Sequence, residues 1–416
     1  MSVVTCFPGK IAGAGAVPPS KSAAHRALIA AALAGGEVIG IAPSADIDAT
    51  LDCLSALGIA ADRQGDRVGF SKGALGENRV ADCRESGSTL RFLIPLFGAL
   101  GISATFTGRG RLPSRPLGVY ADCLPSHGMT LQGDGLPLRV SGRLTAGEFA
   151  LPGNVSSQFL TGLLFALPLC EGDSVLRLTT PLESAGYVEM TLQTLRRAGI
   201  TAKPVAGGWA VPGGQTYRPV THTVEKDWSQ AAFLLAAAAV AGEVTLRGLD
   251  PNSAQGDKEI VSLLRRFGAN VTTHGDTVVC RKAPLKGITL DAAQIPDLVP
   301  ILAVIAAFAD GDTRITGAGR LRIKESDRLA AVADGIRRIG GAVMERPDGL
   351  IVHGGRPLTG GAVEGYNDHR IVMSMAVAAL GSSGAIRITD GEAVGKSWPT
   401  FFEDYQAIGG KAQWDR

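Results

Sequence analysis

The segment LRRAGI at residues 195–200 has the pattern of an amphipathic helix that ends at a glycine and leads into a strand, and this pattern recurs along the whole chain. A glycine at this place is typical of a helix C-cap, where the backbone takes a positive φ that other residues adopt only at a cost. The copies, with glycines about 70 residues apart, are LSALGI at 54–59, LPSHGM at 124–129, LRRAGI at 195–200, LRRFGA at 264–269, IRRIGG at 336–341 and YQAIGG at 405–410. The sequence therefore predicts six copies of one supersecondary unit.

A second predicted helix recurs in the same rhythm, and it runs from small polar or acidic residues into an almost wholly apolar stretch. A helix that is apolar on all sides is buried. Each copy is followed by a glycine-containing turn and a run typical of a strand. The six copies start near Ser22, Ser88, Ser157, Ser229, Asp297 and Asp368. We therefore expect an α/β (α+β) protein in which central helices are buried inside small sheets.

The length of 416 residues exceeds what one hydrophobic core supports, so we expect two domains of three units each. The first copy of the buried helix begins just after the Pro18-Pro19 pair, and the fourth begins after the polar run THTVEKD at 221–227. We place one domain at 20–224 and build the other from 1–19 and 225–416. The chain would then cross between the domains twice, and these crossings would form a hinge.

Composition excludes several classes of function. Forty-one basic and 39 acidic residues give a net charge of +2, unlike a general nucleic-acid binder. The six cysteines are far apart and lack zinc-ligand spacing, so we expect reduced thiols and no metal site. The chain starts without a secretory pattern, and its apolar runs are too short to span a bilayer, so we expect a soluble, cytoplasmic protein with no membrane partner.

Basic residues stand at the starts of the buried helices, notably Lys21 and Arg370. Cations at a helix N-terminus oppose the helix dipole, whereas the N-terminus itself attracts anions, so this placement favours a site for a charged ligand. Further basic residues in loop-like segments could clamp carboxylates or phosphates: Arg115, Lys324, Arg328 and Lys396. The alternative is structural: serine and aspartate here are ordinary N-caps, Asp297 after Pro296 included, and the cations are surface charges or ion-pair partners.

Eight motifs in order along the chain resemble the 5-enolpyruvylshikimate-3-phosphate synthase family of enolpyruvyl transferases. They are PSKSAAHR at 19–26, ESGSTLR at 85–91, LPSRPLG at 112–118, GNVSSQFLTGLL at 153–164, IPDLVPILA at 295–303, RIKESDRL at 322–329, YNDHRIVMSMA at 366–376 and VGKSWPTFF at 394–402. The resemblance implies two domains of threefold repeated βαβαββ units in an inside-out α/β barrel arrangement, with the active site in the interdomain cleft. It also implies transfer of the enolpyruvyl group of phosphoenolpyruvate to the 5-hydroxyl of shikimate 3-phosphate, by a monomer without metal or organic cofactor.

Matching the motifs residue by residue implies the members of the site. In the family pattern the catalytic residues are Asp297 near the hydroxyl and Glu325 near C3 of phosphoenolpyruvate, with Lys21 assisting. Shikimate 3-phosphate is expected to bind mainly to the 20–224 domain, and much of the phosphoenolpyruvate site to come from the other. The shikimate 3-phosphate set is Lys21, Ser22, Arg26, Ser156, Ser157, Gln158, Ser184, Asp297 and Lys324, with Tyr187 packing beside it. The phosphoenolpyruvate set is Lys21, Gly87, Arg115, Gln158, Arg328, Arg370 and Lys396.

Two positions depart from the family pattern. Glu85 and His25 each stand where asparagine is frequent, and a carboxylate beside an anion site disfavours the ligand unless it is turned away or paired. Both departures bear on substrate affinity and on the response to glyphosate, the inhibitor known for this family. Gly87 is retained, so we expect space beside the phosphoenolpyruvate site.

Two other functions compete with this interpretation. The sister family that transfers enolpyruvate to UDP-N-acetylglucosamine carries a reactive cysteine in the loop that matches GRLPSRP at 110–116, and this sequence has none there. A repeat scaffold that binds partners without catalysis needs neither cations at helix starts nor carboxylates beside them. The KESDR segment at 324–328 and the SSQ segment at 156–158 also favour the shikimate-type family over its sister family, and a scaffold would leave the polar pattern unexplained.

Overall fold

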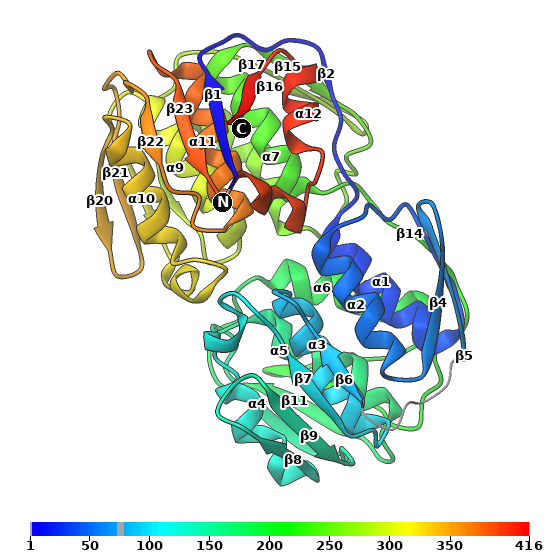
Figure 1. Cartoon of the computed structure of the whole chain (residues 1–416). Coiled ribbons are helices and arrows are strands. Elements are labelled where there is room, and N and C mark those ends of the chain that lie inside the picture. The colour runs from blue at the N-terminus through cyan, green and yellow to red at the C-terminus, as the bar shows by residue number, and fades with distance from the viewer. Residues whose placement is uncertain (1, 73–78, 416) are drawn as a thin grey trace. The chain divides into compact units, whose positions relative to one another are not determined.

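The protein consists of two compact units, seen here in a computed structural model that describes residues 2–72 and 79–415 (Figure 1). The N-terminal unit is Pro19–Val224, and the C-terminal unit combines Met1–Pro18 with Glu225–Arg416. Within the described residues each unit holds three four-stranded sheets. This mixed α/β architecture confirms the predicted fold class.

One plan builds every sheet, and the sheet around α3 (Gly87–Ala99) illustrates it. Strands β6 (Val80–Asp82) and β7 (Ala104–Thr107) are parallel because α3 carries the chain back between them. Strand β9 (Leu138–Gly142) pairs antiparallel with β7, and β8 (Met129–Gln132) pairs with β9 at the edge. The strand order in this sheet is therefore β6-β7-β9-β8, with one parallel pair followed by two antiparallel pairs.

The other two sheets of the N-terminal unit follow the same plan. They contain β14 (Thr221–Thr223), β3 (Glu37–Ile39), β5 (Arg67–Lys72) and β4 (Ile59–Gln64), and β10 (Glu148–Leu151), β11 (Ser174–Leu178), β13 (Gly208–Val211) and β12 (Lys203–Val205). The sheets of the C-terminal unit contain β2 (Ala14–Gly15), β15 (Glu243–Leu246), β17 (Thr277–Arg281) and β16 (Asn270–His274); β18 (Thr289–Asp291), β19 (Asp312–Thr316), β21 (Gly349–His353) and β20 (Ala342–Arg346); and β22 (Gly361–Val363), β23 (Ile386–Thr389), β1 (Val3–Phe7) and β24 (Lys411–Asp415).

Short strands near the two chain crossings pair, within their own unit, with strands that are distant in sequence. Strand β2 pairs in parallel with β15 and so belongs to the C-terminal unit, although α1, which follows it in the chain, belongs to the N-terminal unit. Strand β14 pairs in parallel with β3, nearly 200 residues earlier in the sequence. Strand β1 similarly completes the last sheet between β23 and β24. The chain ends are thereby tied into the C-terminal unit.

The six predicted apolar helices are buried, as their composition requires. In the C-terminal unit α7, α9 and α11 pack against one another, and in the N-terminal unit α3 packs against α5. Every residue of α7 is buried. The structure confirms these helices with the bounds α1 (Lys21–Ala34), α3 (Gly87–Ala99), α5 (Ser157–Ala166), α7 (Trp228–Ala241), α9 (Val299–Phe308) and α11 (His369–Gly381).

The second set of helices ends at the repeated glycines, all of which have the predicted positive φ. These helices are α2 (Ala45–Ser55), α4 (Gly118–Cys123), α6 (Ala185–Arg197), α8 (Ile260–Phe267), α10 (Arg328–Arg338) and α12 (Phe401–Ala407). The φ values are 73° at Gly58, 83° at Gly128, 75° at Gly199, 102° at Gly268, 90° at Gly340 and 102° at Gly409. In this region of φ a side chain would be strained, so glycine is favoured at the turn that follows each helix.

Two further predictions concern the chemistry of the chain as a whole. All six cysteines are buried and free. Among the described residues, none of the helices combines the length and the apolar character that crossing a membrane requires.

Candidate active site

Asp297 lies in a short 3₁₀ turn, η5 (Pro296–Leu298), directly before α9. The structural alternative, in which Asp297 only caps that helix, is wrong: the N-cap of α9 is Leu298, and no side chain caps it. Pro296 starts the tighter turn and moves the aspartate one step outside the helix. The carboxylate is instead held by two guanidinium groups, those of Arg328 and Arg370, each at 3.0 Å.

Arg328 is the centre of the charged cluster in the C-terminal unit. It is the first residue of α10, and its side chain is only 2% exposed. Its guanidinium contacts Asp297 at 3.0 Å, Glu325 at 2.8 Å and Asp368 at 2.8 Å. The three motifs that carry these acids are separated in sequence, yet the repeat brings their helix starts together. Two predicted catalytic acids and one predicted substrate-binding cation are thus in direct contact.

Arg370 completes the cluster from the first turn of α11. Its Nη2 donates to Asp297 Oδ2 and to Ser229 Oγ, both at 3.0 Å, and its Nη1 donates to the Asp297 carbonyl at 3.3 Å. Asp368, the residue that caps α11, accepts from the Arg370 backbone N–H at 2.9 Å. The cap therefore holds the backbone of Arg370, and the contacts with Asp297 and Ser229 hold its guanidinium group.

The electrostatic setting keeps Asp297 ionised. Burial alone would raise its pKa, but Arg370, Lys324 and Arg328 together hold the pKa well below its usual range. The same balance acts on Asp368, where burial opposes the lowering of the pKa that Arg328 and His369 cause. Both carboxylates are therefore charged at neutral pH, and Asp297 is a weak base while its cations remain in place.

The two predicted lysines of the C-terminal unit, Lys324 and Lys396, lie at the ends of short 3₁₀ helices. Lys396 ends the 3₁₀ helix η7 (Gly391–Lys396), and its Nζ donates to the Asn367 carbonyl at 2.6 Å. Asn367 has a φ of 48°, one of the few positive values at a residue other than glycine. Lys324 is half-buried, and burial lowers its pKa to about 8 even though Asp297 and Glu325 act in the opposite direction.

In the N-terminal unit, Lys21 is the first residue of α1 and pairs with an acid. Its Nζ lies 2.6 Å from Asp46 Oδ2, with side-chain exposures of 19% and 13%. Asp46 lies in the first turn of α2. The position of Lys21 at a helix start thus has an ion-pair partner, and the pair stays exposed enough to meet a ligand.

Gly87 brings two further cations to the start of α3. A Cβ at this position would lie 2.6 Å from Arg115 Nη1 and 2.8 Å from Arg91 Nη1, so only glycine lets both guanidiniums lie against the helix start. Gln158, at the start of α5, accepts from Arg91 at 2.8 Å and donates to Ser88 at 2.9 Å. Gly87, Arg115 and Gln158, all predicted to bind phosphoenolpyruvate, therefore form one cluster with Arg91.

Arg26 is deeply enclosed in the N-terminal unit. It is 2% exposed, and four of its five N–H groups donate to Thr191, Ser22, Thr161 and Tyr187. Its guanidinium also lies over the Phe92 and Tyr187 rings at 5.2 and 5.7 Å. Most of its donors thus link α1, α5 and α6, and these contacts hold the Arg26 side chain in one position.

The predicted serines lie at helix starts of the N-terminal unit. Ser156 caps α5 by accepting from the Gln158 N–H, and Ser157 is the first residue of that helix. Ser22 follows Lys21 in α1, whose N-cap is Ser20. Ser184 is buried directly before α6 with a φ of 53°, a strained conformation of the kind that clusters at functional sites.

Three members of these clusters are absent from the predicted sets of catalytic and binding residues. Asp46 and Asp368 each pair with a predicted functional cation, and Arg91 lies against Gly87. Asp368 and Arg91 stand inside the motifs YNDHR and ESGSTLR, which was the available signal, whereas Asp46 stands outside every motif. Glu85, the departure beside Gly87, has its carboxylate against Gly110, in the loop that follows β7.

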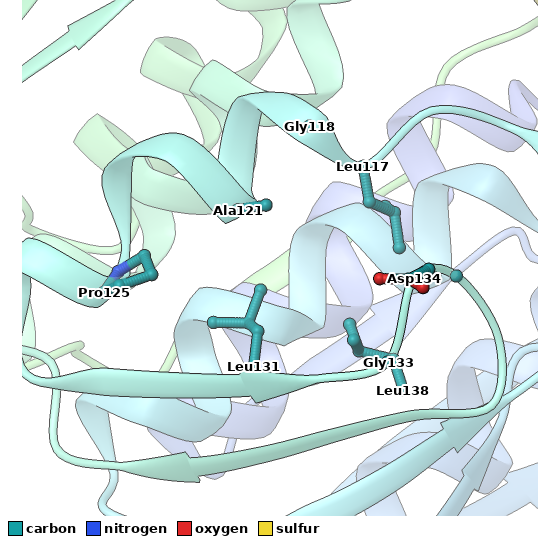
Figure 2. A pocket seen from close by; sticks show the side chains of 9 residues that line it. Leu117, Gly118, Ala121, Pro125, Leu131, Gly133, Asp134 and Leu138 are labelled. Carbon is teal, nitrogen blue, oxygen red and sulfur yellow. The ribbon is translucent and has the colours of Figure 1, made fainter.

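A pocket in the N-terminal unit is separate from these clusters (Figure 2). Its walls include Ala121 of α4, Leu117 directly before that helix, and Leu131 and Leu138 of the β8–β9 hairpin, with Asp134 beside them. None of the predicted site residues lines it. An apolar pocket next to a carboxylate suits neither phosphate nor carboxylate ligands, so the charged clusters remain the candidate site.

Comparison with known proteins agrees with this chemistry. The sequence profile of the EPSP synthase (3-phosphoshikimate 1-carboxyvinyltransferase) family matches residues 7–405. The 3-phosphoshikimate 1-carboxyvinyltransferase of Clostridium novyi is 42% identical over 427 residues, with 99% of this chain and 98% of the relative covered. That of Clostridium acetobutylicum is 42% identical over 421 residues, again covering 99% and 98%.

Solved structures show the same architecture. EPSP synthase from Acinetobacter baumannii superimposes with a TM-score of 0.84 at 27% identity, and both chains are fully covered. The enolpyruvyl transferase NikO from Streptomyces tendae shares the fold, with a TM-score of 0.81 at 18% identity over 99% of this chain and 98% of that one. Because the family profile and full-length relatives near 40% identity both match, the chain belongs to the EPSP synthase (3-phosphoshikimate 1-carboxyvinyltransferase) family.

Proposed function

We propose that this protein transfers the enolpyruvyl group of phosphoenolpyruvate to the 5-hydroxyl of shikimate 3-phosphate, releasing inorganic phosphate. The observation that supports this most is the contact of Asp297 with both Arg328 and Arg370 at 3.0 Å. It joins a carboxylate able to accept a proton to cations able to bind an anionic substrate. The relatives of this chain are named for the same reaction.

The proposal assigns binding residues to both substrates. Arg328, Arg370, Lys396 and Arg115 bind the carboxylate and phosphate of phosphoenolpyruvate, beside Gly87, and Gln158 contributes to both substrates. Shikimate 3-phosphate is held by Lys324 at its phosphate and by Ser22, Arg26, Ser156, Ser157 and Ser184. Lys21 touches both substrates. Bidentate guanidinium groups suit carboxylates and phosphates for geometric as well as electrostatic reasons.

Substrate binding changes the proton affinity of Asp297 in this scheme. Without ligands Arg328 and Arg370 neutralise Asp297, which therefore binds a proton weakly. Phosphoenolpyruvate carries its own negative charges to these guanidiniums and replaces Asp297 as their partner. The pKa of Asp297 then rises, since the cations that held it down are shared with the substrate. The base is thus activated only when the substrate is present.

The proton transfers follow from this exchange. The 5-hydroxyl oxygen attacks C2 of phosphoenolpyruvate while Asp297 takes its proton, and Glu325 delivers a proton to C3, giving a tetrahedral ketal. Glu325 then takes a proton from the C3 methyl group of the ketal, which re-forms the double bond as the C2–O bond to phosphate breaks, and the proton held by Asp297 leaves with the phosphate. Lys21 stabilises the charge on the departing phosphate. No redox step or external reactant is needed for atoms and charges to balance.

Phosphate release tests the proposal. Purified protein is given phosphoenolpyruvate with shikimate 3-phosphate, and separately with UDP-N-acetylglucosamine, in buffer that contains a metal chelator. We expect phosphate release with phosphoenolpyruvate and shikimate 3-phosphate, and none with phosphoenolpyruvate and UDP-N-acetylglucosamine. Release only with the sugar nucleotide would move the protein to the sister activity, and no release with either acceptor would support a non-catalytic scaffold. A monomeric state and a cytoplasmic location stay predictions, of which sedimentation velocity tests the first.

Glu325→Gln is expected to lower kcat by about 10²-fold or more, the usual loss when a positioned acid is removed. The amide keeps the hydrogen bond from Arg328, which contacts Glu325 at 2.8 Å, but it delivers no proton to C3. Exchange of deuterium from solvent into the C3 methylene of phosphoenolpyruvate, followed by mass spectrometry, is therefore lost with the activity. Normal exchange in this variant would assign the C3 proton to another group.

Affinity for shikimate 3-phosphate is expected to fall as pH rises through about 8, where the half-buried Lys324 loses its proton. The lowered pKa means that the ammonium form, which binds the phosphate, dominates only below that value. Between pH 7 and 9 the dissociation constant should rise about tenfold, the effect of removing most of the protonated form. Calorimetry near pH 8 in buffers of different ionisation enthalpy should detect proton uptake on binding. Lys324→Arg keeps the charge and should flatten this pH dependence.

A further inference from the structure

A buried chain of hydroxyl groups connects α1, α2 and the start of α3. His25 Nδ1 lies 2.8 Å from Thr50 Oγ1, which lies 2.7 Å from Thr89 Oγ1. Thr89 Oγ1 donates to Ser86 Oγ at 2.7 Å. All four side chains are at most 1% exposed. Solvent therefore cannot replace any link, and each hydrogen bond must be satisfied within the chain.

Counting hydrogens fixes the direction of this chain. Thr89 has one hydroxyl hydrogen and gives it to Ser86, so Thr50 must be the donor in its contact with Thr89. With that hydrogen used, Thr50 can only accept from His25, which must carry its hydrogen on Nδ1. The longer 3.3 Å contact of Thr50 with the Asp46 carbonyl shares the Thr50 hydrogen only weakly.

The other ring nitrogen of His25 agrees with this assignment. Nε2 is buried and has no hydrogen-bond partner among the described residues. A bare lone pair there costs less than a buried N–H group without an acceptor, which is rare in proteins. Burial, Lys21 and Arg26 all lower the pKa of His25 well below its usual value, so the ring is neutral. A neutral ring with its single hydrogen on Nδ1 makes His25 the donor, so the hydrogen bonds run from His25 through Thr50 and Thr89 to Ser86.

The chain of hydroxyls runs beside the Lys21 ion pair. Lys21 and His25 are four residues apart on α1, and their partners Asp46 and Thr50 are four residues apart on α2. The two contacts are therefore neighbouring rungs between the same two helices. At its other end the chain reaches Ser86, whose Oγ caps α3 by accepting the Thr89 N–H at 3.2 Å. The next residue is Gly87, against which Arg115 and Arg91 lie.

We propose that His25 and Thr50 are positioning residues, which align the first turn of α3 at Gly87 with the Lys21 face of α1 through this hydrogen-bonded chain. Neither residue belongs to the substrate-binding sets. The proposal deepens the proposed function, because it states what sets the geometry of the phosphoenolpyruvate side of that site. Asparagine, the frequent residue at position 25 in the family pattern, also offers an N–H donor to Thr50, whereas leucine offers none.

A spectroscopic test does not depend on turnover. Protein labelled with ¹⁵N-histidine is expected to show His25 neutral with its hydrogen on Nδ1, the signal being assigned by its loss in His25→Asn. In Thr50→Val the acceptor is gone, so the hydrogen should move to Nε2 and exchange at the Thr89 amide should quicken. A hydrogen on Nε2 in the unaltered protein, or an unchanged tautomer in Thr50→Val, would overturn the proposal even if the enzyme proves active.

A kinetic test separates positioning from stability. Thr50→Val and His25→Leu are expected to raise the KM for phosphoenolpyruvate about 5- to 10-fold, the effect of one lost hydrogen bond, with kcat changed less than about 2-fold. His25→Asn should restore the KM, and the His25→Leu/Thr50→Val double variant should be no worse than either single one, since both break the same chain.

The matched control is Thr313→Val. Thr313 is a fully buried threonine of β19 that accepts the Ile288 N–H at 3.3 Å, outside the candidate site. It should lower stability comparably and leave the KM unaltered. Equal KM values for Thr50→Val and Thr313→Val, or additive effects in the double variant, would reduce the chain to an ordinary core contact. If the protein releases phosphate with neither shikimate 3-phosphate nor UDP-N-acetylglucosamine, the proposed function is wrong. The tautomer of His25 still tests the positioning proposal in that case.

Discussion

Asp297→Asn is expected to lower kcat by about 10²- to 10⁴-fold, the contribution of a positioned general base, while phosphoenolpyruvate binds more tightly. The amide keeps the size of the side chain but cannot take the proton of the 5-hydroxyl. Arg328 and Arg370, each 3.0 Å from Asp297, lose the carboxylate that competes with the substrate for them. Single-turnover rates measure the first effect, and calorimetric titration of phosphoenolpyruvate in the presence of shikimate 3-phosphate measures the second.

The opposite direction of the two effects makes this experiment decisive. A residue that only supports the fold would weaken binding and catalysis together. Asp312→Asn is the matched control, since Asp312 is an exposed acid of the same unit, paired with His353 at 2.8 Å, and its loss should change neither quantity. Near-normal turnover in Asp297→Asn would remove this residue from the proton transfer.

The repeats and their buried helices could be predicted because local rules determine them. A positive φ at the six spaced glycines and an apolar surface on all sides of α7 follow from single residues and their neighbours. The pairing of β2 and β14 could not be predicted in this way. These strands of two and three residues are too short to show a periodic pattern, and their pairing partners are distant in sequence.

In the candidate site, too, local features could be predicted from the sequence and long-range contacts could not. Cations at helix starts, such as Lys21 and Arg370, are visible in the sequence because they contradict a local preference. Their acidic partners are not visible, since Asp46 and Asp368 also suit the first turn and the cap of a helix, where acids are ordinary. The N-cap alternative for Asp297 was wrong for a related reason: the Pro296 turn displaces it from the cap position. Contacts between distant segments thus remain the part that only the fold reveals.

Asp368→Asn is expected to lower the free energy of unfolding of the C-terminal unit by about 3–5 kcal/mol, the cost of leaving a buried charge without its partner. Asp368 is fully buried and contacts Arg328 at 2.8 Å, while Ser326 donates to it at 2.9 Å. Asparagine still caps a helix, so the variant isolates the loss of charge from the loss of the α11 cap. Urea unfolding followed by tryptophan fluorescence in a Trp209→Phe background, where Trp228, Trp398 and Trp414 remain, reports on this unit.

The pH dependence and a neighbouring acid give the controls. Because Arg328 lowers the pKa of Asp368, its stabilising effect is complete above about pH 4, the value of an unfolded aspartate, and is lost as pH falls further. The difference between Asp368→Asn and the unaltered protein should therefore shrink in acid. Asp327, which caps α10, pairs with Arg322 at 3.0 Å but is 34% exposed, so Asp327→Asn should cost only about 0–1 kcal/mol. Equal losses in the two variants would mean that the buried ion pair contributes no more than an exposed one, and that Arg328 is held by Asp297 and Glu325 alone.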